Sequence, residues 1–280
     1  MVWPRRPLPN PEKSILETLS YSDKYDYPLT PFEIWFWQIS STFPLNKLTS
    51  WPYITAGLYH LKGRSNLVPI RKKRALNSQN KWYIAESVAR LLKKIPSVQA
   101  VFITGSLSMN NCPEFDDIDM MLVTSPYTLW FTRPVTVMLL KFLKLRRDPY
   151  LPEHSSLRVN NKICDNLWLD QNHLCVPARN LYTAHEVLQA KCLFDRGGIH
   201  HQFILQNSWA KNYLYVAYKE TLKQFNRPVV SNHRSNILNV ILFAINYLLF
   251  TIQYLHMRPR LTREKIGLGY AFFHPDSPPV

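Results

Sequence analysis

Three stretches of apolar residues stand out from the more polar sequence around them. Residues 98–104 read VQAVFIT and residues 118–124 read IDMMLVT, with a short polar connection between them, and residues 162–170 read KICDNLWLD. Short apolar runs bounded by glycine, proline or polar clusters are typical of buried strands. We therefore predict three strands of a small mixed sheet within residues 81–180.

Helical periodicity precedes and follows these strands. Residues 81–95 place apolar side chains at helical spacing, and residues 132–147 are strongly apolar with a basic end, which suits a helix C-terminus. Four more helices are predicted at 183–194, 198–207, 208–225 and 236–257, the first with Thr183 and Glu186 as a capping box. The pattern predicts an α+β fold, with a core at 81–180 and a C-terminal helical region at 181–280.

The first 80 residues have a different pattern. After a Pro-rich leader at 1–11, we predict helices at about 12–27, 30–37 and 47–61, the second with Thr30 and Glu33 as a capping box, and a hairpin at 61–70. Three short helices and a hairpin are similar to a winged-helix module, and the basic run at 71–74 favours DNA binding. The second and third helices are aromatic-rich with few basic residues, which favours a small helical cap instead.

The segment 237–257 is long enough to cross a bilayer, because its 21 residues carry no charge before His256. However, Asn239, Asn246 and Gln253 recur every seven residues and give the helix one polar side. This stripe favours a mostly buried helix of a soluble protein over a membrane span. The tail at 269–280, with its Phe-Phe pair, is expected to dock on the body of the protein.

Composition narrows the environment and the partners. The 280 residues are 46% hydrophobic, enough for a core, and the net charge of +15 favours an anionic partner such as nucleic acid, a nucleotide or an acidic membrane surface. The four cysteines form no C-x-x-C pair, so neither a zinc knuckle nor a disulfide framework is indicated. No apolar run follows the N-terminal arginines, so no secretory signal is predicted, and we expect a cytoplasmic protein.

Two acids interrupt the second apolar run. Asp117 and Asp119 are two residues apart and therefore share one face of a strand. Buried acids are costly unless a cation neutralises them; a divalent metal such as Mg2+ takes carboxylate oxygens, and nearby lysines are the alternative. The first run ends at Gly105-Ser106, where glycine permits the close approach of a phosphate and a following helix offers free N–H groups.

A Gly-Ser turn, a connection at 107–116 and then Asp-Ile-Asp within an apolar strand resemble the signature of the DNA polymerase β-like nucleotidyltransferase superfamily. The resemblance implies that Gly105 and Ser106 hold the triphosphate of an NTP and that Asp117 and Asp119 ligate Mg2+, with two ions expected. The implied activity is the transfer of a nucleoside monophosphate to an acceptor with release of pyrophosphate. The wider layout is also similar to bacterial nucleotidyltransferase-domain proteins.

The resemblance also implies a third catalytic carboxylate on a neighbouring strand. Asp165 lies inside the predicted strand and is our choice, whereas Asp170 lacks its parity, and Asn166 is an alternative occupant of that place. Arg133 and Lys162 are the cations nearest to these strands in sequence, and we assign them to the phosphates. The alternative for each is an ordinary charged residue on the protein surface.

The remaining polar residues leave two questions open. Asp116 has the opposite strand parity and is expected to face solvent rather than support the metal ligands. His185, His200 and His201 are expected to be solvated or capping residues rather than a second metal site. The acceptor is not indicated, although the basic charge favours a polyanion such as nucleic acid. A second interpretation is a DNA-binding regulatory protein whose transferase-like core only senses nucleotide.

Overall fold

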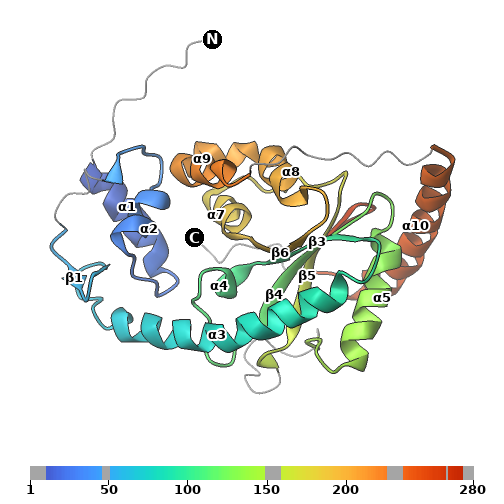
Figure 1. Cartoon of the computed structure of the whole chain (residues 1–280), viewed down its shortest axis with the longest axis horizontal. Coiled ribbons are helices and arrows are strands. Elements are labelled where there is room, and N and C mark those ends of the chain that lie inside the picture. Colours follow the sequence, from blue (N-terminus) through green and yellow to red (C-terminus); the bar gives the residue numbers. More distant parts are fainter. Residues whose placement is uncertain (1–10, 46–50, 149–158, 226–235, 263, 274–280) are drawn as a thin grey trace, which may run out of the picture. The chain divides into compact units, whose positions relative to one another are not determined.

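The computed structural model describes residues 11–45, 51–148, 159–225, 236–262 and 264–273 (Figure 1). Within these residues the fold is α+β with a six-stranded mixed sheet, as expected. The chain divides into two compact units, one drawn from residues 1–76, 177–188 and 207–226, and the other from 77–176, 189–206 and 227–280. Each unit therefore combines segments that are distant in sequence, unlike the three consecutive segments expected.

The sheet of the second unit has the strand order β6-β3-β4-β5-β8-β7. At its centre, β3 (Val98–Ile103) is antiparallel to β4 (Ile118–Thr124), and β4 is parallel to β5 (Ile163–Asp170). The outer strands are antiparallel to their inner neighbours: β6 (Lys191–Asp195), β8 (Tyr270–Phe272) and β7 (Lys265–Gly267). The three predicted strands are confirmed, and they form the middle of the sheet.

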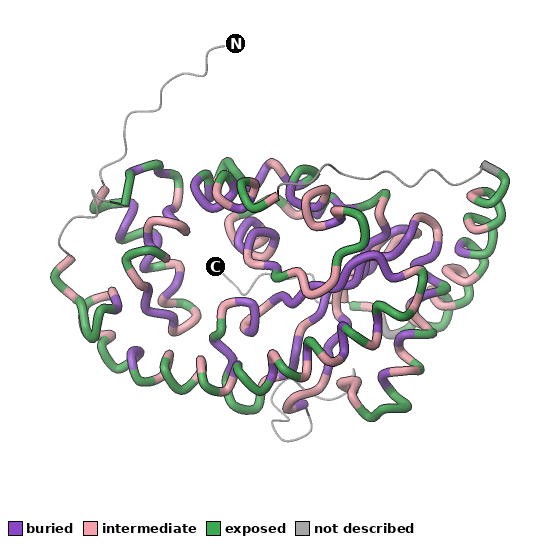
Figure 2. Tube along the Cα trace, in the orientation of Figure 1, coloured by how far each residue is buried: buried purple, intermediate pink, exposed green. Residues whose placement is uncertain are grey.

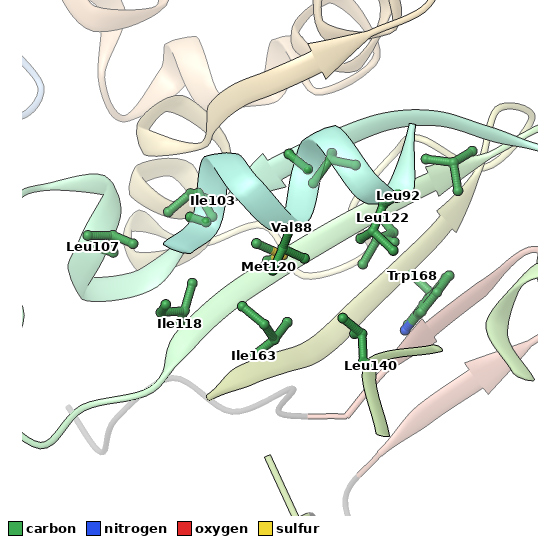
Figure 3. Close-up of a cluster of buried hydrophobic side chains, with 14 of the residues drawn as sticks. Val88, Leu92, Ile103, Leu107, Ile118, Met120, Leu122, Leu140, Ile163 and Trp168 are labelled. Atoms are coloured by element: carbon green, nitrogen blue, oxygen red, sulfur yellow. The ribbon is translucent and has the colours of Figure 1, made fainter. Parts of the chain in front are cut away.

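Both faces of the central strands are covered. On one face, Val88 of helix α3 (Leu67–Leu92) and Leu140 of helix α5 (Leu129–Phe142) pack with Met120 and Trp168 (Figure 3). On the other face, Phe102 contacts Phe203 of α8 (Ile199–Gln206), with ring centroids 5.8 Å apart. Because strands covered on both sides are apolar throughout, this packing explains the continuous rather than alternating runs in the sequence.

The connection from β4 to β5 positions Arg146 and Arg147. Parallel neighbours require a crossover, and α5 supplies it. The helix ends at Phe142, earlier than the expected residue 147, and Lys144 has a positive φ of 56°. The chain therefore turns out of the helix before Arg146 and Arg147, which run beside the start of β5 instead of ending the helix.

Residues 181–195 differ from the expected single helix. Helix α7 (Leu181–Gln189) is followed by strand β6, which pairs with β3 through Phe194 and Val101. Thr183 is not the helix cap: Asn180 precedes the helix, and its Oδ1 accepts from Thr183 N at 2.9 Å. The capping box predicted for Thr183 and Glu186 is therefore wrong, and pairing with a distant strand overrides the helical pattern of 191–195.

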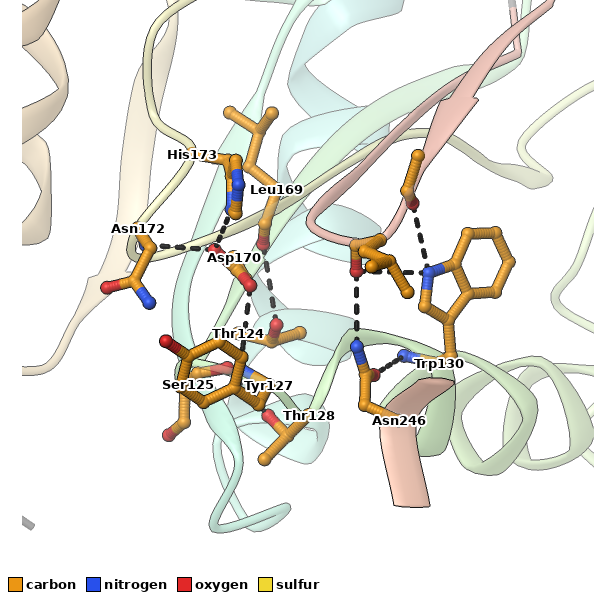
Figure 4. A network of polar contacts seen from close by, with 12 residues as sticks. Thr124, Ser125, Tyr127, Thr128, Trp130, Leu169, Asp170, Asn172, His173 and Asn246 are labelled. Atoms are coloured by element: carbon orange, nitrogen blue, oxygen red, sulfur yellow. Dashed lines mark hydrogen bonds and ion pairs between the residues drawn. The ribbon is translucent and has the colours of Figure 1, made fainter. Parts of the chain in front are cut away.

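Helix α10 (Asn236–Met257) docks on the second unit along its polar stripe (Figure 4). Asn246 Oδ1 accepts from Trp130 N at 2.9 Å, and its Nδ2 donates to Leu268 O at 3.2 Å. Gln253 Nε2 donates to Trp130 O at 2.6 Å. The polar side is thus confirmed as a seam, but the prediction of a mostly buried helix is wrong, because only 6% of its most apolar 18-residue window is buried (Figure 2).

The C-terminal residues that the structure describes complete the sheet. After α10 come the short helix η3 (Arg258–Arg260) and the strands β7 and β8. Strand β8 pairs with β5, so the described part of the tail docks on the body as expected. The end of β5 is closed by Asp170, whose Oδ1 accepts from Asn172 N at 2.9 Å and lies 2.7 Å from His173 Nδ1 (Figure 4).

The first unit is mainly helical. It contains α1 (Pro11–Asp23), α2 (Pro31–Phe36), the start of α3, α7, the 3-10 helix η2 (Ser208–Asn212) and α9 (Tyr215–Lys223). The capping box at Thr30 and Glu33 is confirmed: Thr30 N donates to Glu33 Oε2 at 2.8 Å, and Glu33 N donates to Thr30 Oγ1 at 3.2 Å. Residues 208–225 form two short helices rather than the single one expected.

The winged-helix order is not observed. Residues 46–50 of the expected third helix lie outside the described residues, and the rest holds a hairpin of β1 (Ile54–Thr55) and β2 (Leu58–Tyr59). Ala56 and Gly57 both have positive φ, which matches the two-residue turn that suits strand twist. Helix α3 then begins at Leu67, so the expected hairpin at 61–70 is wrong, and the helix expected at 81–95 is the second half of α3.

The basic run at 71–74 lies in α3 and is partly neutralised. Arg71 Nη1 pairs with Glu33 Oε2 at 2.8 Å, and Arg74 Nη2 pairs with Asp26 Oδ2 at 3.2 Å. Two of its four cations therefore stabilise the first unit itself. This use weakens the case for DNA binding through the run.

Candidate functional site

The turn after β3 brings a glycine against an acid. β3 leads into the one-turn helix α4 (Gly105–Ser108), and the chain returns in β4. Gly105 has a φ of 59°, and a Cβ at this position would lie 2.5 Å from Asp119 Oδ2. Thr104 N donates to Asp119 O at 3.1 Å and fixes the turn beside that residue. The structure thus places Gly105 and Asp119 together, as their spacing predicted.

Asp117, Asp119 and Cys164 form a group of three possible metal ligands. Their ligand atoms all lie within 4.8 Å of one another, and Asp119 and Cys164 are register partners in the parallel strand pair. Burial, followed by the nearby carboxylates of Asp119 and Asp117, raises the pKa of the Cys164 thiol, so it stays protonated at neutral pH. The two carboxylates, of Asp117 and Asp119, suit a hard cation and fit Mg2+.

Two arginines that the sequence interpretation assigned to a helix end are paired with the acids. Arg147 Nη1 lies 2.5 Å from Asp117 Oδ2, and Arg146 Nε lies 2.6 Å from Asp165 Oδ1. The two are held in place by backbone pairing with the start of β5, where Arg147 N donates to Ile163 O at 2.8 Å. The signal in the sequence was two adjacent arginines between the end of a predicted helix and a strand that carries an acid.

Asp165 is not among the three ligand groups. Its carboxylate accepts from Arg146 at 2.6 and 3.3 Å, and the residue beside Asp119 is Asn166, whose Nδ2 donates to Asp119 Oδ1 at 2.7 Å. The pairing of β4 and β5 shifts register between Asp119 and Met121, where β5 has one extra residue. The alternative in which Asn166 occupies the place beside the acids is therefore the one observed.

Ser106 contacts an acid that was expected to face solvent. Its Oγ donates to Asp116 Oδ2 at 2.6 Å and lies 3.2 Å from Cys112 Sγ. Burial raises the pKa of Asp116, although the bond from Ser106 opposes this shift. The expectation of a solvent-facing Asp116 is wrong, because the residue lies before β4 begins and strand parity does not apply to it.

Lys81 is a buried cation behind the acids that sequence reasoning missed. Its side chain is 1% exposed, and Nζ donates to Asp116 O at 2.6 Å, to Asn160 Oδ1 at 3.0 Å and to Asn161 Oδ1 at 3.1 Å. Burial lowers its pKa. Lys81 therefore joins α3 to the loops that precede β4 and β5, and so helps to position Asp117.

A cavity of about 610 Å3 adjoins the ligand group. Cys164 is the member of the group that lines it, Arg147 lines it as the partner of Asp117, and its walls carry more cations than acids. The lining residues are Arg133, Val137, Lys141, Arg146, Arg147, Cys164, Asp165, Asn166, His256, Met257, Leu261, Glu264 and Phe273. Arg133 Nε, Arg147 Nε and Asn166 Oδ1 are buried without a hydrogen-bond partner in the described part of the chain. Such atoms usually bind a ligand or water.

The two cations assigned to phosphate from the sequence lie in different places. Arg133 lines the cavity, where its guanidinium packs 4.6 Å from the Phe273 ring centroid and its Nη1 donates to Gln253 Oε1 at 3.2 Å. Lys162 does not line it, and its Nζ donates to Lys144 O at 2.6 Å. The structure therefore brings Arg133, but not Lys162, to the cavity.

We expected His185, His200 and His201 to be solvated or capping residues, but two of them pack against aromatic rings. His185 stacks on Tyr21 with ring centroids 4.0 Å apart, and His200 meets Phe102 edge-on at 5.2 Å. Neither belongs to the ligand group found among the described residues.

Comparison with known proteins gives no identification. No protein-family model matches the chain, and no curated protein is significantly similar to it.

Proposed function

We propose that this protein is a Mg2+-dependent nucleotidyltransferase that transfers a nucleoside monophosphate from an NTP to an acceptor hydroxyl. One observation carries the proposal: a glycine turn in contact with Asp119 lies beside a cation-lined cavity, and two residues that line this cavity, Arg147 and Asn166, bind the carboxylates of Asp117 and Asp119. An ordinary turn needs no glycine in contact with an acid, and an ordinary acid pair needs no adjoining cavity of ligand size.

Asp117 and Asp119 would hold the metal. Bound Mg2+ supplies positive charge to the phosphates and so favours in-line displacement at phosphorus. Arg147 pairs with the Asp117 carboxylate and also lines the cavity, so its guanidinium would lie close to both a metal held by Asp117 and a bound phosphate. Arg133, Arg146 and Lys141 line the same space and would neutralise a bound triphosphate.

A bond forms between the acceptor oxygen and the α-phosphorus, the bond from that phosphorus to the β-phosphate oxygen breaks, and pyrophosphate leaves. We assign Asp165 to accept the hydroxyl proton rather than to bind metal, because it lines the cavity but lies outside the ligand group. Gly105 would let the phosphate approach the backbone, whereas the hydroxyl of Ser106 donates its hydrogen bond to Asp116.

The test is pyrophosphate release from each NTP with Mg2+ and a panel of acceptor classes. Asp119→Asn keeps an oxygen that can accept from Asn166, so the fold should survive while activity falls by at least about a hundredfold. Glu86→Gln is the matched control, because Glu86 is a carboxylate on the exposed surface of α3. Equal activity in the two variants would refute the assignment.

A further inference from the structure

Most residues of helix α10 are exposed or only partly buried (Figure 2), and apolar side chains are exposed around most of its circumference. Such an apolar helix in a soluble protein is ordinarily buried on all sides. Here ten large apolar side chains are exposed: Ile237, Leu238, Val240, Ile241, Phe243, Ile245, Tyr247, Leu248, Ile252 and Leu255. The described part of the chain therefore leaves most of this helix without a covering partner.

The seam described above fixes α10 along the body. Asn246 and Gln253 both bond to the backbone of Trp130, and the Phe250 and Trp130 rings pack with centroids 5.2 Å apart. A membrane-spanning position would have to break these contacts or take α5 with it. The exposed sides can instead meet a partner while the seam stays closed.

Helix α5 lies beside α10 (Figure 1). It adds a second exposed apolar stripe. Phe131, Val135, Met138 and Phe142 recur at helical spacing on the side away from the core, and Met138 and Phe142 are 70% and 84% exposed. We call the exposed residues of α5 and α10 together the apolar surface.

The sequence around the apolar surface contains basic residues and no acids. Residues 120–147, which include α5, hold five Lys and Arg residues and no Asp or Glu, and residues 221–263, which include α10, hold six and none. Arg146 and Arg147 among them already pair with Asp165 and Asp117. Lys141, Lys144 and Arg258 are exposed at the ends of the two helices. An anionic partner would complement this charge.

We infer that the apolar surface rests on an anionic phospholipid bilayer, with α5 and α10 lying in the plane of the membrane interface. Apolar side chains flanked by basic residues are the pattern of helices that bind membranes in this way. A second copy of the chain is a poorer occupant, because a symmetric pair would bring the two acid-free regions together. The inference does not depend on the proposed enzymatic activity.

Flotation of the purified full-length protein with vesicles tests the inference. Vesicles of phosphatidylcholine alone are compared with vesicles in which phosphatidylglycerol makes up about a third of the lipid. We expect binding to the anionic vesicles that weakens as salt is added. Ile241→Glu/Leu248→Glu should weaken binding at least about tenfold, because both positions are exposed and would place charge in the apolar layer.

The matched control is Leu76→Glu/Tyr83→Glu, which places two glutamates seven residues apart at exposed positions of α3. It should bind like wild type. Lys141→Gln/Lys144→Gln should weaken binding by roughly fivefold for each lysine. Circular dichroism checks that every variant is folded.

Three outcomes would overturn the inference. The first is no binding to the anionic vesicles, and the second is equal weakening by both glutamate pairs. The third is a dimer in sedimentation equilibrium that the α10 pair alone dissociates, which would assign the surface to a second copy.

Discussion

Replacing Gly105 by alanine tests the geometry of the site directly. The added Cβ would lie 2.5 Å from Asp119 Oδ2 and 3.3 Å from its Cγ, so the Asp119 side chain would have to move. The movement would break its hydrogen bond from Asn166. The φ of 59° also strains any residue with a Cβ.

The two costs can be estimated separately. Placing alanine in the left-handed region costs about 1–2 kcal/mol. The lost bond between Asn166 and Asp119 adds about 1 kcal/mol. We therefore expect Gly105→Ala to lower the free energy of unfolding by about 2–3 kcal/mol, and to affect metal binding more than stability, because the displaced atom is a proposed ligand oxygen.

Urea unfolding with and without Mg2+ measures both effects. At a Mg2+ concentration about a hundredfold above its dissociation constant, wild type should gain about 2.7 kcal/mol of unfolding free energy. Gly105→Ala should lose most of this gain. Gly63→Ala is the matched control, because Gly63 has a φ of 77° and its Cβ would meet no atom within 4 Å. Equal stability losses and equal Mg2+ gains in the two variants would refute the reasoning.

Two further substitutions test buried titratable side chains. Lys81→Met removes the donor to three acceptors and should lower the free energy of unfolding by about 2–4 kcal/mol, measured with urea, whereas the exposed Lys72→Met should change it little. Burial lowers the pKa of His185 to about 3. Below pH 6.5 the unfolded chain therefore binds more protons than the folded chain, and the free energy of unfolding decreases as the pH is lowered. Between pH 7 and pH 5 His185→Phe should lose about 2 kcal/mol less than wild type, and identical losses would contradict this explanation.

The part of the site that could be predicted from the sequence is local. Gly105 begins the turn after β3, Asp117 directly precedes β4 and Asp119 lies in β4, so their relation follows from the local geometry of a short stretch of chain. The central strands could also be predicted from the sequence, because strands covered on both faces need continuous apolar runs.

What the sequence interpretation missed depends on contacts between distant residues. Arg146 and Arg147 reach the acids because Lys144 turns the chain out of α5 and the start of β5 pairs with it. Lys81 lies on a helix whose lysines would ordinarily be assigned to solvent. Its burial is explained by distant acceptors, the carbonyl of Asp116 and the side chains of Asn160 and Asn161. Strand β6 exists because β3 offers it an edge.

The sheet order has a consequence for folding during synthesis. Leu167 of β5 pairs with Phe272 of β8, about a hundred residues later, and Val101 of β3 pairs with Phe194 of β6, which is nearly as distant. While the chain emerges from a ribosome, β3, β4 and β5 can assemble long before either outer strand exists. Both edges of this three-stranded intermediate would then be open to other chains, which makes the interval before β8 appears the stage most exposed to aggregation.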